Sequence, residues 1–136
     1  MARRSFLRYA GIGAASMGML ATAACKKDHS VKLNNGIDVG SGDFGILNYA
    51  YALEQLEAAF YIQVVASPYS GMSDKEKVYL TAIRDHEVAH REFFKAALKE
   101  NAIKPLTPDF SSINFGARAS VLGAAKAFED LGVTAY

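Results

Sequence analysis

The chain has 136 residues, with 15 basic and 14 acidic side chains, 51% hydrophobic residues and one cysteine. This length accommodates one globular domain, and the apolar content is too high for an intrinsically disordered chain. A single thiol excludes a disulfide scaffold, and a near-neutral charge without a basic cluster excludes nucleic acid as the expected partner.

The first 25 residues predict an export signal. Arg3 and Arg4 precede an uncharged stretch over residues 9–24 that is rich in Ala, Gly and Met. A basic start, a short apolar stretch and small residues before a cleavage point are typical of a signal peptide. The segment from Arg3 to Arg8 resembles a twin-arginine export signal, which implies a bacterial protein that crosses the inner membrane already folded. A basic amphipathic first helix is the alternative.

Cys25 at the end of this stretch resembles a lipobox cysteine, whose thiol is acylated after cleavage. Thr22 departs from the branched aliphatic residue usual in that motif, so ordinary cleavage after Ala23 stays open. Residues 26–42 have little apolar content and predict a flexible tether. We therefore expect a periplasmic or cell-envelope protein held at the membrane by a lipid. Removal of the basic signal leaves a slightly acidic protein, with no electrostatic reason for a polyanionic partner.

Residues 43–136 predict a helical domain. A first helix is expected over residues 44–66, with Asp43 at its N-cap. Its apolar residues form one broad side of a helical wheel. The polar residues that fall opposite are Asn48, Gln55 and Gln63.

A capping box predicts the start of a second helix. Ser73 and Glu76 have the required spacing, and the helix is expected to continue to about Asn101. The connection between the first two helices is short, which predicts that they are antiparallel.

Residues 102–114 contain two prolines and no clear periodicity, and they predict a long crossover. A third helix is expected to begin near residues 115–117 and to continue to Tyr136. Three long helices, each with an apolar side, predict an all-α bundle.

Acidic residues interrupt the apolar sides of the first two helices. Glu87 and His90 lie one turn apart within the apolar arc of the second helix, which comprises Tyr79, Leu80, Ile83, Phe93, Phe94, Ala97 and Leu98. Glu54 and Glu57 lie among the apolar residues of the first helix, which has no Lys or Arg. Burial of unpaired carboxylates is costly, so a divalent metal is the predicted counter-charge.

The chain also contains an internal repeat. Residues 51–61 match residues 126–136 at an Ala, a Glu, a Leu and the final Tyr. The match aligns Glu54 with Glu129, so the first and third helices are interpreted as versions of one unit.

The same alignment separates the two glutamates of the first helix. Glu57 stands opposite Gly132, so it is interpreted as an acid near the metal or as a merely buried acid, rather than a ligand. Tyr61 and Tyr136 each follow a repeat glutamate by seven residues, share its helix face and are expected to donate hydrogen bonds near the site. A tyrosine of the hydrophobic core is the alternative for each.

This combination of two Glu-x6-Tyr units, one Glu-x-x-His and a long crossover resembles the ferritin-like superfamily of di-metal carboxylate four-helix bundles. In detail it is similar to exported bacterial ferritin-like domain proteins, over about residues 43–136. The resemblance implies an up-down bundle in which Glu54 and Glu129 are single-Glu ligands, Glu87 is a bridging carboxylate and His90 is a terminal ligand. It also implies two iron or manganese ions that react with dioxygen or peroxide.

The sequence departs from the family pattern in one respect. A fourth helix with a second Glu-x-x-His is expected near position 162 from the repeat offset, beyond the 136 residues of the chain. Three of four helices, three of four glutamates and one of two histidines are therefore present. The chain is a fragment, a second copy supplies the helix in a homo-oligomer, or the metal site is degenerate.

Other interpretations of the second helix stay open. His86, Glu87 and His90 also spell H-E-x-x-H, the signature of zinc metallopeptidases, in which two histidines bind zinc and the glutamate activates water. A surface ion pair of Glu87 with Arg84 or Arg91 would need no metal at all. A non-catalytic helical envelope protein that keeps the fold without the chemistry is the third alternative.

Overall fold

Three long helices make up most of the computed structural model, which describes residues 36–135. They are α2 (Gly42–Ala66), α3 (Asp74–Leu98) and α4 (Arg118–Ala135), and a short 3-10 helix η1 (Lys99–Asn101) follows α3. No strand occurs in this part of the chain. The prediction of an all-α fold is confirmed. Arg3, Arg4, Cys25 and Tyr136 lie outside the described residues, so the predictions for them stay predictions.

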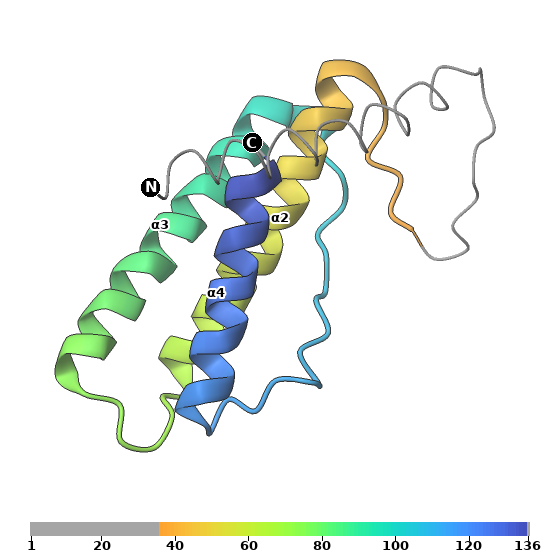
Figure 1. Ribbon diagram of the computed structural model, residues 1–136. Coiled ribbons are helices and arrows are strands. Elements are labelled where there is room, and N and C mark those ends of the chain that lie inside the picture. The colour runs from red at the N-terminus through yellow and green to blue at the C-terminus, as the bar shows by residue number, and fades with distance from the viewer. Residues whose placement is uncertain (1–35, 136) are drawn as a thin grey trace, which may run out of the picture. The chain divides into compact units, whose positions relative to one another are not determined.

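Helix α2 is the central element of the bundle (Figure 1). The short turn after Ala66 returns the chain, so that α3 runs antiparallel to α2. The crossover then runs back along α2, and α4 again runs antiparallel to it (Figure 1). Helix α2 packs against both other helices, and much more extensively against α3 than against α4. Inward-facing residues of α3 and of α4 therefore pack mainly against α2.

The N-terminus of α2 lies earlier than predicted. Ser41, not Asp43, is the N-cap residue, and Asp43 lies in the first turn, where its charge favours the positive end of the helix dipole. Gly40 and Gly42 have φ angles of 83° and 60°, which residues with a side chain rarely adopt. These two glycines turn the backbone into the helix before Asp43 is reached.

Glu76 joins the start of α3 to the start of α4. Its Oε2 accepts hydrogen bonds from Ser73 N at 2.9 Å and Ser73 Oγ at 2.7 Å, which confirms the predicted capping box. Its Oε1 lies 2.6 Å from Arg118 Nε. At the other end, α3 stops at Leu98 rather than Asn101, because Lys99 takes a φ of 52° and the last turn tightens to a 3-10 helix.

The hydrophobic core is built around α2 and includes residues of α3, α4 and the crossover. Phe60 is fully buried, and the aromatic rings around it have centroids 5.1 to 5.9 Å from its own. These rings belong to Tyr61 of α2, Phe110 and Phe115 of the crossover, and Phe128 of α4. Several meet edge to face, a favoured geometry for aromatic pairs. This cluster fixes α4 and the crossover on one side of α2.

Two polar residues of α2 are buried, contrary to the prediction. Asn48 and Gln55 are 4% and 6% exposed, whereas Gln63 is exposed as expected. Asn48 Oδ1 accepts a hydrogen bond from Ile103 N at 2.9 Å, and Gln55 Oε1 accepts one from Leu106 N at 2.8 Å. An extended segment lying on a helix needs acceptors for its N–H groups, and these side chains provide them.

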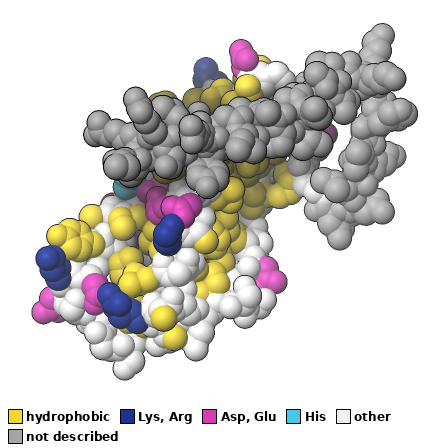
Figure 2. Space-filling view, viewed as in Figure 1, with side chains coloured by type: hydrophobic (Ala, Val, Ile, Leu, Met, Phe, Trp, Pro, Cys, Tyr) yellow, Lys and Arg dark blue, Asp and Glu magenta, His cyan; other side chains and the backbone are white. Residues whose placement is uncertain are grey.

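Part of the predicted apolar arc of α3 is exposed. Tyr79 and Phe93 are 58% and 67% exposed, and Leu80, Glu87 and Leu98 are the buried residues of this helix. Only α2 packs extensively against α3 in the described chain, so the arc is wider than the surface that covers it. Figure 2 shows hydrophobic side chains exposed among charged ones on the face that it draws. No helix of the described residues is long and apolar enough to cross a membrane.

Glu76→Gln is expected to weaken stability at neutral pH and to flatten its acid dependence. The Ser73 and Arg118 contacts lower the pKa of Glu76 to about 2. A depressed carboxyl pKa contributes stability that is present above the unfolded-state value and lost as pH falls toward the folded-state value. Urea unfolding between pH 2 and pH 6 should show this loss in the parent and not in the variant. Equal acid slopes would contradict the prediction.

Asn48→Ala is expected to destabilise the fold by about 2 to 3 kcal/mol, because buried backbone groups lose their partners. The Asn48 amide also donates to Asn101 O at 2.8 Å and to Val39 O at 3.2 Å. Gln63→Ala, an exposed change on the same helix, is the matched control and should stay within about 0.5 kcal/mol. The free energy of unfolding in urea measures both. Equal effects would show that the crossover does not depend on Asn48.

Candidate metal centre

Three carboxylates are buried between α2 and α3. Glu54 is 3% exposed, and Glu57 and Glu87 are each 5% exposed. Glu54 and Glu57 lie one turn apart on α2, and Glu87 faces them from the antiparallel α3. One oxygen from each of the three lies within 4.8 Å of the others. The helix pairing thus brings three acids into a space in which ionised carboxylates repel strongly.

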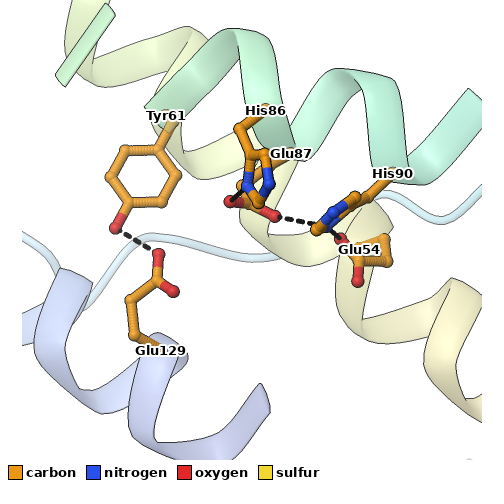
Figure 3. Close-up of polar contacts among 6 residues, drawn as sticks. All are labelled: Glu54, Tyr61, His86, Glu87, His90 and Glu129. Carbon is orange, nitrogen blue, oxygen red and sulfur yellow. Dashed lines mark hydrogen bonds and ion pairs between the residues drawn. The ribbon is translucent and has the colours of Figure 1, made fainter. Parts of the chain in front are cut away.

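His90 reaches the same space from α3 (Figure 3). Its Nδ1 lies 3.3 Å from Glu54 Oε2 and 3.3 Å from Glu87 Oε2. The i, i+3 spacing predicted from sequence therefore places the imidazole beside Glu87, and the helix pairing adds Glu54. The structure brings together three of the four residues predicted as ligands.

His86 contacts the other side of the Glu87 carboxylate. Its Nδ1 lies 2.9 Å from Glu87 Oε1, and its side chain is 65% exposed. This contact raises the pKa of the His86 imidazole, because the adjacent carboxylate favours the charged ring. Glu87 therefore has an imidazole beside each of its oxygens.

Glu129 of α4, the fourth predicted ligand, lies on another side of the cavity. Its Oε1 accepts a hydrogen bond from Tyr61 OH at 2.7 Å (Figure 3). Burial and this hydrogen bond raise the pKa of the Tyr61 phenol, so Tyr61 keeps its proton. Glu129 belongs to neither of the two close groups of metal-binding atoms found in the described residues. Its partner Tyr61 comes from the repeat unit of α2.

The charges around Glu57 are carboxylates. Burial, followed by the charges of Glu54, Glu129 and Glu87, raises the pKa of Glu57 to about 8. The predicted alternative of a surface ion pair at Glu87 is wrong. Among residues 36–135, Arg84 pairs with Asp85 at 2.6 Å and Arg91 with Glu92 at 2.7 Å, and neither arginine forms an ion pair with Glu87.

Gly132 of α4 makes room for Glu57. A Cβ atom on Gly132 would lie 3.0 Å from Glu57 Oε1, closer than side chains normally approach. The two positions correspond in the internal repeat, and in the structure they face each other. The repeat alignment interpreted Glu57 as an acid outside the ligand set, yet its carboxylate lies in the same close group as Glu54 and Glu87. Its i, i+3 spacing from Glu54 is the signal that could have identified it.

These residues surround a cavity of about 340 Å³. Its lining comprises Glu54, Glu57, Ile83, His86, Glu87, His90, Glu129, Gly132 and Val133. Carboxylate oxygens and imidazole nitrogens are ligands for divalent iron, manganese and zinc. The donor set therefore fits a divalent transition metal, and the convergence of buried acids provides the negative charge that would attract it.

Comparison with known proteins agrees with this geometry. A family model described as a ferritin-like domain matches residues 42–136, well over half of the chain. The searches of curated proteins and of solved structures found no significant match. The matched segment contains every helix described above.

Gly132→Ala is expected to stabilise α4 less than Gly123→Ala. Replacing an exposed glycine within a helix by alanine gains about 0.5 to 1 kcal/mol, and a Cβ on Gly123 meets nothing within 4 Å. At Gly132 the same gain is offset by displacement of the Glu57 carboxylate. Urea unfolding of both variants measures the difference.

Glu57→Ala provides the control for this contact. In that background, Gly132→Ala should recover the full gain seen at Gly123, because the opposing carboxylate is absent. Identical effects of Gly132→Ala in the presence and absence of Glu57 would contradict the close approach.

Proposed function

Because the chain belongs to the ferritin-like domain family, we propose that it binds iron or manganese between α2, α3 and α4. The observation that carries the proposal is the convergence of Glu54, Glu57 and Glu87, all buried, beside His90. No Lys or Arg in residues 36–135 forms an ion pair with Glu57 or Glu87. A divalent cation is the counter-charge that this arrangement would accept.

We assign the ligand roles from the contacts of each side chain. Glu54, Glu87 and His90 would hold the metal directly, because one carboxylate oxygen of each glutamate already lies 3.3 Å from His90 Nδ1. Glu129 would contribute from α4, with its carboxylate oriented by the Tyr61 hydroxyl. Tyr61 is thus a positioning residue, and Tyr136 has the matching place in the sequence repeat.

Glu57 would adjust the net charge of the site by holding or releasing a proton. Its pKa of about 8 means that it carries a proton near neutral pH when only carboxylates surround it. A cation beside the cluster favours the ionised form, so metal binding would release this proton to solvent. Glu57 could then bind the metal directly or neutralise it from a short distance.

When bound, iron or manganese would supply one-electron chemistry toward dioxygen or peroxide. The surrounding chain supports such chemistry by separating the site from bulk water on the α2 side, where Phe60 and Tyr61 are buried. We therefore propose metal oxidation with dioxygen or peroxide as the activity.

We further propose that the protein is exported by the twin-arginine pathway and anchored at the cell envelope through Cys25. The order of Arg3, Arg4, an apolar stretch and a cysteine supports this proposal. Residues 26–42 would tether the domain. The exposed apolar side chains of α3 offer a surface for a further helix, from a longer form of this chain or from a second copy of it.

Glu87→Ala or His90→Ala is expected to lose most of the bound iron or manganese. The full-length protein, loaded with Fe²⁺ without oxygen or with Mn²⁺, is assayed by elemental analysis after desalting. Glu92→Gln, an exposed acid on the same helix, is the matched control and should retain the metal. A parent protein that retains neither metal would contradict the proposal.

Glu54→Leu separates this function from a non-catalytic scaffold. A metal present at 100 times its dissociation constant stabilises the folded state by about 2.7 kcal/mol, and the variant should lose that increment. Urea unfolding with and without Mn²⁺ measures it. A variant as stable as the parent under both conditions favours the scaffold.

A further inference from the structure

A pair of imidazoles lies on the solvent side of the buried acids. His86 and His90 are four residues apart on α3, their ring centroids are 4.0 Å apart, and the rings are inclined by 58°. The side chains are 65% and 43% exposed, whereas Glu87 between them is 7% exposed. Spacing of i, i+4 on one helix face is the arrangement in which two histidines can hold one ion.

Both imidazoles face the same carboxylate from opposite oxygens. His86 Nδ1 lies 2.9 Å from Glu87 Oε1, and His90 Nδ1 lies 3.3 Å from Glu87 Oε2. One atom each of His86, Glu87 and His90 lies within 4.8 Å of the other two. Neighbouring ligands of a tetrahedral zinc ion are about 3.4 Å apart, so exposed rings can reach this spacing by side-chain rotation.

Glu87 therefore belongs to two groups of different chemistry. The inner group, Glu54, Glu57 and Glu87, offers oxygen only and is buried. The outer group, His86, Glu87 and His90, offers two nitrogens and one oxygen and borders solvent. Imidazole favours borderline ions such as Zn²⁺ or Co²⁺, and carboxylate favours harder ions such as Mn²⁺.

We propose that His86, Glu87 and His90 form an outer position that binds a zinc-like divalent ion through two imidazoles, distinct from the inner carboxylate position. The inference rests on the proposed function and deepens it, since Glu87 and His90 would be ligands in both the inner and the outer position. His86 is the residue that distinguishes the two positions. Glu87 acts here as a ligand with an imidazole at each oxygen, and not as a base for water as in a metallopeptidase.

The test uses the full-length protein with one equivalent of Zn²⁺ alone. Zinc X-ray absorption should count two imidazoles per zinc in the parent and one in His86→Ala. Competition with a chromophoric chelator should show at least a tenfold loss of zinc affinity in His86→Ala. Asp85→Ala, an exposed neighbour, is the matched control and should change neither measurement. Glu57→Gln should keep two imidazoles per zinc, because Glu57 belongs only to the inner group.

Several results would overturn the outer position. The first is a parent protein that binds no zinc, and the second is a parent with fewer than two imidazoles per zinc. The third is a His86→Ala variant with the same number of imidazoles per zinc and the same zinc affinity as the parent. Circular dichroism checks the fold, and His86→Gln provides a second variant at this exposed position. Zinc affinity unchanged in Glu87→Gln would also overturn it, because the carboxylate would then be no ligand.

The outcome is separable from that of the proposed function. Iron or manganese retained by both the parent and His86→Ala, without a two-imidazole zinc site, would overturn this inference and leave the proposed function standing. A two-imidazole zinc site in a parent that retains neither iron nor manganese would support the outer position and overturn the inner one.

Discussion

Repulsion between buried carboxylates is the constraint on which the structure of the site depends. Glu54, Glu57 and Glu87 lie within a few ångströms of one another, and two ionised acids at such a distance repel by about 4 kcal/mol at an effective dielectric constant of 20. Packing cannot relieve this repulsion, because both helices are held along their lengths. Either a proton stays on the cluster or a cation joins it. The raised pKa of Glu57 represents the first solution, and metal binding represents the second.

The scaffold keeps the acids together through contacts on both sides of them along α2. On one side, Asn48 fastens the segment after α3 through Asn101 and Ile103. On the other side, the aromatic rings around Phe60 hold α4 and the crossover. Between these attachments the side chain of Gly132 is absent, so the Glu57 carboxylate fits against α4. The rigidity of α2 is therefore what converts a sequence spacing into a fixed distance between carboxylates.

Sequence periodicity predicted the helices and most of the acids, because a capping box and an i, i+3 pair are local features. The pairing of Glu87 with His90 follows from helix geometry alone. Sequence periodicity could not predict that Asn48 and Gln55 would be buried, because their hydrogen-bond partners are backbone groups more than 50 residues away. The contact of Glu57 with Gly132 could not be predicted for a related reason. Its environment is set by Gly132 of another helix, and an alignment of the repeat shows correspondence but not contact.

The sharing of Glu87 between two sets of ligands has an electrostatic consequence. One carboxylate carries a single negative charge, so two divalent ions that share it would each reduce its attraction for the other. The cluster can compensate only by gaining negative charge, and Glu57 is the group that holds a proton it can release. Occupation of one position would then favour ionisation of Glu57, and this ionisation would support the second ion. In this way Glu57 would let the two proposed positions hold more positive charge than the cluster balances while Glu57 is protonated.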